Sequence, residues 1–237
     1  MTTDPRKVAN AFSIKSLTYV EAMEMSHFGA KVIYPPTIQP ALEQKIPIRI
    51  KNVLNPDFEG TVISEKSAAN NDFIIKGISS IENIALLRAQ GSGMIGVVGI
   101  AGRLFSALSR EKINVILITQ ASSEHSICFA IERNEGKRAK KILEQEFSLE
   151  IQTHHIDEII VEKDLSIVAV VGENMRKTPG IASRLFQALA SNGINIVAIA
   201  QGSSELNISV VIDERVNTKA LNAIHEIFFF SGEKKTV

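Results

Sequence analysis

Two near-copies of one short stretch constrain this chain more than any other feature of its sequence. Residues 118–124 read Ile-Thr-Gln-Ala-Ser-Ser-Glu, and residues 199–205 read Ile-Ala-Gln-Gly-Ser-Ser-Glu. The two stretches lie 81 positions apart, and about half of the positions from Gly99 to Glu132 recur at this offset without a gap. Such self-similarity indicates two copies of one structural unit.

The charge balance argues against a nucleic-acid partner. Lys and Arg together number 26 among the 237 residues, and Asp and Glu together also number 26, so there is no basic surplus. With two Tyr and no Trp, the chain has little aromatic surface on which bases could stack. We therefore expect no nucleic-acid binding.

The sequence also gives no sign of a membrane partner. No apolar run approaches the length of a membrane span, and the first residues are polar, unlike a signal peptide. The single cysteine, Cys128, excludes an internal disulfide, and its apolar neighbours indicate packing and not a nucleophile. A cytoplasmic location is expected.

Residues 1–64 carry helix and strand patterns but few apolar positions. Thr18 followed three residues later by Glu21 has the spacing of a capping box, and Gly29 is a natural helix stop. These residues offer too little apolar surface for a core of their own, so we interpret them as the end of a larger domain. Residues 65–72 are the predicted linker. A short helix and two strands are predicted at Thr37–Gln44, Ile46–Ile50 and Thr61–Ile63.

The two repeated segments have the same order of predicted elements. Apolar residues at helical spacing predict helices at Ile100–Ser109 and Lys137–Phe147 in the first segment. In the second segment, Thr178 and Pro179 suggest an N-cap and a proline start for the first helix. The remaining predictions are strands at Phe73–Ile78, Ile84–Ala89, Asn114–Thr119, Ser126–Ile131, Ile151–Val161, Ile167–Val171, Asn195–Ala200 and Asn207–Ile212, and helices at Ile181–Ala190 and Thr218–Phe229.

Each copy is therefore β-α-β-β-α, and one more strand would complete the βαββαβ arrangement of a ferredoxin-like fold. Residues 151–161 can supply that strand for the first copy. The second copy has no such strand after it, but residues 73–78 stand ahead of the first copy as 151–161 stand ahead of the second. We predict an α+β fold in which the first unit (82–162) is inserted into the second (73–81 and 163–231).

A glycine-rich loop precedes the first helix of the first copy. Gly91, Gly93 and Gly96 have the spacing of a dinucleotide-binding fingerprint and stand between a strand and a helix. The second copy lacks this spacing, and no acidic residue ends the next strand of the first copy. We interpret the segment as a flexible loop whose backbone N–H groups could receive a carboxylate. An NAD(P)-binding enzyme domain stays open as an alternative.

Gln120 and Gln201 each follow an apolar strand directly. A glutamine amide has two donors and one acceptor, which suits the carboxylate and ammonium groups of an amino acid. The alternative is that each glutamine caps a turn and the Ser-Ser pair forms a hairpin. His154 and His155 are expected in an extended stretch, where neighbours face opposite ways and cannot share a metal. Without a catalytic triad, zinc spacing or P-loop, no catalytic residue and no metal site are predicted.

Three segments carry a family resemblance. Residues 2–6 (Thr-Thr-Asp-Pro-Arg) and 28–32 (Phe-Gly-Ala-Lys-Val) resemble the closing segments of the amino-acid kinase domain of aspartokinases. Residues 195–205 resemble the paired ACT regulatory domains of that family, most closely in the bifunctional aspartokinase–homoserine dehydrogenase type. The resemblance covers essentially all of the chain, although the usual His-Pro after the second segment is Tyr34-Pro35 here.

The resemblance implies a regulatory role. In this family, paired ACT units join chains, which implies a homodimer or higher homo-oligomer, and bind an end-product amino acid that inhibits the kinase. Threonine is the favoured effector, with lysine and methionine as further candidates, and Gln120 and Gln201 match the glutamines that bind it. Coupling to the kinase part is expected through residues 45–64. The other candidate effector-binding residues are Gly99, Ile100, Ala101, Asn114, Gly180, Ile181, Ala182 and Asn195.

The resemblance also bears on catalysis. Arg6, Lys31 and Val32 match positions that contact ATP in the kinase domain. The family's Lys-Phe-Gly-Gly motif is absent, together with nearly all of the catalytic lobe and the dehydrogenase domain. We therefore expect this chain alone not to phosphorylate aspartate, and ATP to be a cofactor of the full-length parent only. A purely structural dimerisation module is the remaining alternative.

Overall fold

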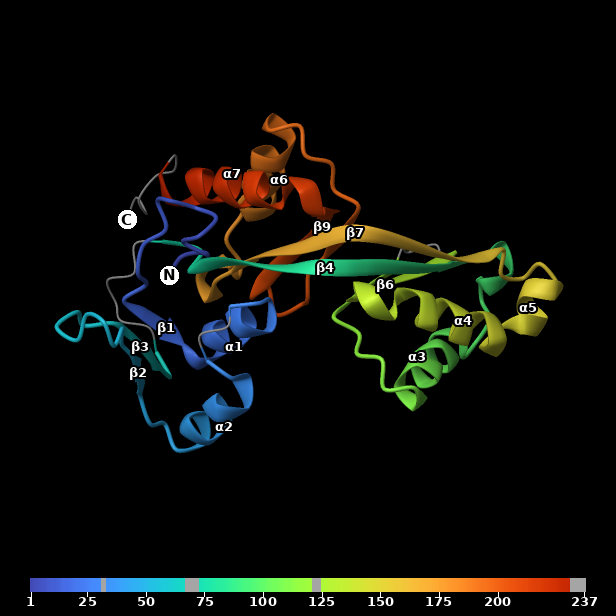
Figure 1. Ribbon diagram of the computed structural model, residues 1–237, viewed down its shortest axis with the longest axis horizontal. Coiled ribbons are helices and arrows are strands. Elements are labelled where there is room, and N and C mark those ends of the chain that lie inside the picture. The colour runs from blue at the N-terminus through green and yellow to red at the C-terminus, as the bar shows by residue number, and fades with distance from the viewer. Residues whose placement is uncertain (31–32, 67–72, 121–124, 231–237) are drawn as a thin grey trace. The chain divides into compact units, whose positions relative to one another are not determined.

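The computed structural model describes residues 1–30, 33–66, 73–120 and 125–230 (Figure 1). The chain divides into two compact units. The inserted unit is Glu82–Ser166, and the outer unit combines Met1–Ile81 with Ile167–Val237. Within the described ranges, no helix has both the length and the apolar character needed to cross a bilayer.

The inserted unit contains the first copy. Two long strands, β4 (Gly77–Gln90) and β7 (Glu158–Val171), begin and end it and extend beyond its bounds. Between them, in chain order, are η1 (Ser92–Met94), α3 (Ile100–Arg110), β5 (Leu117–Gln120), β6 (Ser126–Glu132), η2 (Arg133–Glu135), α4 (Gly136–Glu146) and α5 (Ser148–Gln152). The strands run in the order β5-β6-β4, and β6 is antiparallel to both neighbours. Figure 1 shows α3 and α4 on the same side of β6.

The predicted helical stripes form the core of the inserted unit. Leu104 and Leu108 of α3 are fully buried in one cluster with Leu143 of α4 and Phe129 of β6. Residues three and four positions apart share one helix face, so the sequence pattern directs these side chains to the sheet. Each such burial stabilises the fold by about 1.5–3 kcal/mol before entropy is considered.

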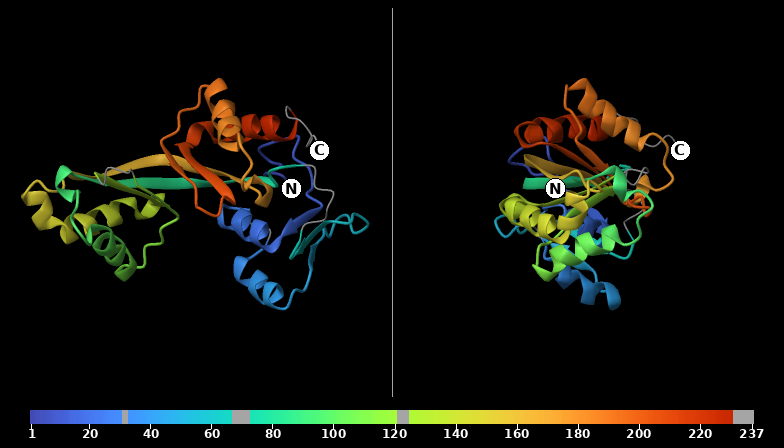
Figure 2. Two further views of the ribbon diagram at one scale, coloured as in Figure 1. Left: turned by 180° about the vertical axis from the view of Figure 1, so that it is seen from behind. Right: turned by 90° about the vertical axis from the view of Figure 1, so that its right-hand side faces the viewer.

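The outer unit contains the second copy, whose elements each begin 81 residues after their counterparts. After β7 they are η3 (Glu173–Met175), α6 (Ile181–Ser191), β8 (Ala198–Ala200), β9 (Asn207–Asp213), η4 (Glu214–Val216) and α7 (Asn217–Phe229). Figure 2 shows α6 and α7 on the same side of β9. Leu185, Leu221 and Ile224 from these helices are buried in the core of this copy. The sequence duplication is therefore a structural duplication.

The segment that closes the second copy comes from residues ahead of the first copy, as predicted, but its strand begins at Gly77 and not at Phe73. The Lys76 N–H donates to the Val171 carbonyl over 2.7 Å, and the Ile75 side chain is buried in the core of the second copy. In the first copy, the equivalent bond runs from the Asp157 N–H to the Gln90 carbonyl over 2.8 Å. The fold is α+β, with tandem ferredoxin-like units, the first inserted in the second.

Two predicted breaks between strands are wrong. β4 runs through the predicted gap between Ile78 and Ile84, and β7 runs through the gap between Val161 and Ile167. The polar side chains in these gaps do not interrupt the strands, because strand pairing depends on the backbone. One residue with a φ of 59° marks the same point of each strand: Asn83 and Asp164.

Several predicted strand starts are also wrong. β5 begins at Leu117 and β8 at Ala198, three residues later than the apolar pattern indicates in each copy. Ile113, just ahead of the first of these strands, is buried in the core without belonging to the strand. Ile151 lies in α5 and not in a strand. The apolar alternation at these positions follows which side chains are buried. The backbone hydrogen bonds that define each strand span fewer residues than the apolar pattern does.

Residues 1–64 form a small sheet with two helices. In chain order the elements are β1 (Ser16–Thr18), α1 (Tyr19–His27), α2 (Pro35–Glu43), β2 (Ile48–Ile50) and β3 (Thr61–Ser64). The predicted capping box is present, because Thr18 and Glu21 each bond the other's backbone N–H. β2 is an edge strand in the order β1-β3-β2, as expected next to Pro47. β1 is missed by the sequence pattern, since three residues show no periodicity.

The boundaries of the amino-terminal part stay predictions. Contacts group residues 1–64 with the second copy in the outer unit. Of the predicted linker, residues 67–72 lie outside the described residues.

Candidate ligand-binding site

In the first copy, strand register brings Gln120 to the same sheet edge as the glycine-rich loop. β4 and β5 both pair antiparallel with β6, so they run parallel to each other. Gln120 pairs with Ile127, and Gln90 pairs with Ser126 on the other side of β6. Neighbouring strands lie about 4.8 Å apart, which places the backbone of Gln120 roughly 10 Å from the end of β4. Gln120 is exposed there.

In each copy, the helix that follows the first strand and its loop begins without a side-chain cap. Gly99 is the N-cap residue of α3 with a left-handed φ of 94°, and Gly180 has the same place in α6 with a φ of 89°. The first N–H groups of a helix have no acceptor within it and attract a carboxylate. Ile100 and Ile181 are buried, so a ligand would meet their backbone. Ala101 and Ala182 follow them, each half-buried.

The predicted cap of α6 is wrong. The Thr178 hydroxyl donates to the Asn174 carbonyl over 2.7 Å, and the helix begins at Ile181 after a left-handed Gly180. Pro179 therefore lies outside the helix. The two copies share one kind of helix start, although only the second carries a Thr-Pro sequence.

In the second copy, the segment that follows Gln201 contacts the loop ahead of α6. The Lys177 N–H donates to a Glu205 carboxylate oxygen over 2.6 Å, and the Gly172 N–H donates to the Leu206 carbonyl over 3.0 Å. Lys177 and Glu205 both have left-handed φ values, of 58° and 55°. Gln201 is exposed directly after β8. In the first copy, residues 121–124 lie outside the described residues.

The two candidate asparagines lie elsewhere in their copies. Asn114 stands ahead of β5 and Asn195 ahead of β8, at the other end of each strand from Gln120 and Gln201. Both asparagines are exposed. Within one copy, therefore, the glutamine, the helix start and the preceding loop gather at one edge, and the asparagine is apart from them.

The glycines of the fingerprint-like loop have a packing explanation. A Cβ on Gly91 would stand closer than 3.0 Å to the His155 carbonyl oxygen, and one on Gly93 would stand 2.5 Å from the His155 Cα. Gly172 of the second copy is in the same position, 2.7 Å from the Ile74 carbonyl oxygen. Residues 74 and 155 also differ by 81, so each glycine admits the closing segment of its own copy.

Of the residues matched to ATP contacts, the structure describes only Arg6. Its guanidinium bonds the Asp4 carboxylate over 2.8 Å, and this hydrogen bond holds the pKa of Asp4 below its usual range. The Arg6 side chain is otherwise exposed. Lys31 and Val32 lie outside the described residues.

Among the described residues, the reactive side chains elsewhere do not form a second site. Burial raises the pKa of the Cys128 thiol, which opposes the activation that a nucleophile requires. The prediction that His154 is extended is wrong, because its φ of 58° places it in a turn, and His155 bonds the Thr153 hydroxyl over 2.7 Å. No group of His, Cys, Asp and Glu suited to a metal ion occurs in the part of the chain that the structure describes.

The models of two known protein families match this chain. The ACT domain model matches residues 87–147 and 168–228, two segments that again differ by 81. The amino acid kinase family model matches residues 1–52. The bifunctional aspartokinase/homoserine dehydrogenase of Haemophilus influenzae is 48% identical over 236 residues, covering 100% of this chain and 29% of the relative.

The chain belongs to the aspartokinase family. It spans less than a third of the length of this bifunctional relative. Among solved structures, the aspartate kinase of Clostridium acetobutylicum matches with a TM-score of 0.85 at 30% identity, covering 96% of this chain and 52% of that chain. E. coli aspartokinase III in complex with lysine and aspartate, in its T-state, matches with a TM-score of 0.76 at 28% identity, covering 96% and 49%.

These matches define the segment as the regulatory ACT region of an aspartokinase, preceded by the end of the amino acid kinase domain. Sequence patterns identified the glutamines and the capping box of Glu21, but they missed the long-range hydrogen bonds that Glu21, Glu24 and Glu205 accept. Glu205 belongs to the repeated motif, yet its partner, Lys177, is distant in sequence. No sequence periodicity marks such a contact, because it depends on how two loops meet.

Proposed function

We propose that this segment senses a free amino acid for the aspartokinase to which it belongs. The observation that carries the proposal is that Gln120 lies at the sheet edge where an uncapped helix begins, and that Gln201 repeats it 81 residues later. A carboxylate suits the N–H groups at the helix start. An ammonium or hydroxyl group suits the amide oxygen of the glutamine.

Threonine is the effector that this chemistry favours. A neutral amide can accept from a hydroxyl group but gives no charge to balance a second ammonium group, as lysine would require. The E. coli relative whose structure contains lysine and aspartate is a separate aspartokinase at 28% identity. Lysine and methionine remain the competing ligands to be measured.

We further propose that two copies of the chain pair through their ACT units. β5 is the edge strand of the first copy, and β8 is the edge strand of the second copy. Ile118 and Ile199 on these strands are 51% and 43% exposed, although both are large and apolar. Edge strands with exposed apolar side chains are a common basis of self-association.

The parent activity is proposed to be phosphorylation of aspartate with ATP, which requires a catalytic lobe outside this sequence. The chain alone is expected to be inactive in a coupled kinase assay. A dinucleotide site at Gly91, Gly93 and Gly96 is disfavoured, because the first two admit the backbone of His155. For the same reason, substitution of Gly93 would disturb packing and could not test cofactor binding alone.

Calorimetry with threonine, lysine and methionine tests the sensor. We expect threonine to release or absorb heat on binding, and Gln120→Ala and Gln201→Ala each to weaken its affinity by about tenfold, the effect of losing about 1.4 kcal/mol of hydrogen bonding. Gln145→Ala and Gln187→Ala are matched controls, because both glutamines are exposed on helices away from the strand ends. Absence of heat from all three amino acids would refute the sensor.

A further inference from the structure

α1 of the amino acid kinase part packs directly against the second copy. Tyr19 and Met25 are buried in one cluster with Val171, the last residue of β7. The Ser79 hydroxyl of β4 donates to the Met25 carbonyl over 3.3 Å. Gly29, just past the helix, lies so close to the Ser80 carbonyl that a Cβ could not be added. This helix is therefore a fixed part of the outer unit.

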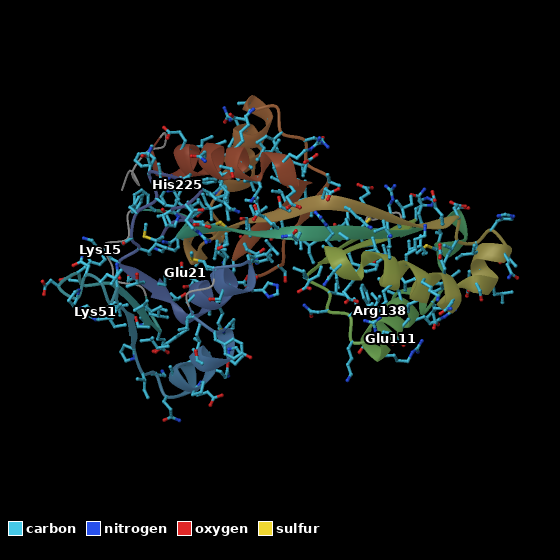
Figure 3. All side chains as sticks on the ribbon, in the orientation of Figure 1. Lys15, Glu21, Lys51, Glu111, Arg138 and His225 are labelled. Carbon is cyan, nitrogen blue, oxygen red and sulfur yellow. The ribbon has the colours of Figure 1, made fainter. Side chains whose placement is uncertain are left out.

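The buried carboxylate of Glu21 connects α1 to the loop ahead of α6. Glu21 is only 1% exposed, and Figure 3 shows it on α1. One carboxylate oxygen accepts from the Thr18 N–H over 2.9 Å. The other accepts from the Glu173 N–H, also over 2.9 Å. Because both oxygens have backbone donors, a buried charge that would otherwise be costly is satisfied.

A second carboxylate one turn along the same helix reaches the other loop of the site. The Asn207 side-chain N–H donates to Glu24 over 2.6 Å. Asn207 begins β9 and follows Glu205, whose carboxylate accepts from the Lys177 N–H. Both segments that border Gln201 and the start of α6 are thus attached to α1.

We propose that α1 transmits ligand occupancy of the second copy to the amino acid kinase part, through Glu21 and Glu24. The proposal rests on the sensor function proposed above. A ligand that draws the loop at 172–180 and the segment at 201–207 together changes the backbone positions that these two carboxylates hold. Ligand binding and the position of α1 are then coupled, and the coupling acts in both directions.

This route is specific to the second copy. At the offset of 81, the residues equivalent to Glu173 and Asn207 are Ser92 and Ser126 in the first copy. Ser126 lacks the side-chain amide with which Asn207 bonds Glu24. The route also differs from the one through residues 45–64 that the resemblance suggests. Substitution of Gln201, but not of Gln120, is therefore expected to abolish the effect of the ligand on α1.

Hydrogen exchange of the whole 237-residue chain, with and without saturating L-threonine, tests this. In the unsubstituted 237-residue chain, threonine is expected to slow hydrogen exchange of the amides of residues 19–27 by roughly 5- to 150-fold, the usual range of allosteric coupling. Gln120→Ala should keep this response and Gln201→Ala should lose it. If the unsubstituted chain bound threonine without slower hydrogen exchange in α1, the proposal would be overturned.

Two variants test the carboxylate contacts. Glu21→Gln keeps the side-chain shape but turns an NH2 group toward a backbone donor, and Asn207→Ser introduces the residue of the first copy. Each variant is expected to bind threonine but to lose most of the threonine-induced slowing of hydrogen exchange in α1. Glu59→Gln, an exposed residue of the same part, is the matched control and should behave as the parent. If threonine slowed hydrogen exchange in α1 of both test variants as much as in the unsubstituted chain, the proposed contacts would be contradicted.

A ligand-free measurement separates this inference from the sensor function. Without any amino acid, Glu21→Gln should speed exchange of the amides at residues 173–178, since Glu173 loses its acceptor. If threonine, lysine and methionine all fail to bind, the sensor function fails. The connection between α1 and the loop is then decided by this measurement alone, and unchanged exchange would exclude it.

Discussion

The two copies share the order and the starting positions of their equivalent elements but differ in what they pack against. Gly99 and Gly180 begin equivalent helices with nearly equal φ values, and Gly91 and Gly172 admit equivalent closing segments. The side chains differ where the second copy packs on residues 1–64. Buried His225 of α7 corresponds to exposed Glu144 of the first copy.

This difference shows which features a duplicated unit must keep. Helix starts, close glycine contacts and the closing strand are needed by each copy for its own fold, so they recur at the offset of 81. Partners outside the copy are free to differ. The second copy has gained contacts with the amino acid kinase part, at Glu173, Asn207 and His225.

The largest expected effect tests the close glycine contacts in both copies. Gly91→Ala should lower the free energy of unfolding by about 3 kcal/mol and Gly172→Ala by about 2 kcal/mol, because a Cβ would overlap backbone atoms. Gly91 has the closer contact, with His155, so its substitution should cost more. Both glycines have extended φ values, so backbone strain adds nothing. Urea unfolding followed by circular dichroism measures the difference.

Gly102 is the matched control for these substitutions. It lies in α3, and an added Cβ would meet no neighbouring side chain, so Gly102→Ala should stabilise the protein by about 0.5–1 kcal/mol. If Gly91→Ala and Gly102→Ala had the same effect, the glycine-rich loop would not be explained by packing on His155. A role in holding a ligand would then have to be reconsidered.

The sequence alone predicts the duplicated fold well, for a physical reason. Both helical stripes and most strands follow from apolar periodicity, and the missing sixth strand follows from the order of elements. Long strands are misread as pairs, because Ser79 and Asn83 are polar but remain in β4. Gln120 is identifiable because it repeats. For Glu21, the spacing predicts the capping box with Thr18 but not the bond with Glu173, which lies 152 residues away.

A middle-sized effect is expected at His225, which only the second copy buries. Figure 3 labels this residue. Its Nε2 lies 2.8 Å from the Thr2 hydroxyl, and burial lowers the pKa of its imidazole. Thr2→Val should cost about 1–2 kcal/mol, because the ring and the Phe12 N–H both lose the hydroxyl as a partner. Since the unfolded chain protonates His225 first, stability should fall as pH drops below about 6.5.

Comparing unfolding at pH 7.5 and pH 5.5 tests the sign of this dependence. His225→Gln should reduce the loss of stability between these conditions, because the residue no longer titrates. His154→Gln is the control, since His154 is exposed in the inserted unit. An equal loss in parent, His225→Gln and His154→Gln would show that burial of His225 does not create the pH dependence.

The smallest expected effect concerns one turn that the copies build with different residues. After α3 and after α6, a backbone N–H reaches the carbonyl five residues back over 3.0 Å, from Ile113 to Leu108 in the first copy. The residue in the turn is Lys112 in the first copy and Gly193 in the second, with φ values of 57° and 65°. A left-handed conformation costs about 1–2 kcal/mol for a residue with a side chain and almost nothing for glycine. The first copy therefore retains strain that the second copy has relieved.

Exchanging these residues should exchange the strain. Lys112→Gly should raise the free energy of unfolding by about 0.5–1 kcal/mol, and Gly193→Lys should lower it by about 1 kcal/mol. Both positions are exposed, and no atom would obstruct a Cβ at Gly193, so packing does not interfere. Lys141→Gly, within α4, should instead destabilise by about 1 kcal/mol, because glycine is unfavourable inside a helix. If Lys112→Gly and Lys141→Gly were equally destabilising, the left-handed turn would not be the source of the difference between the copies.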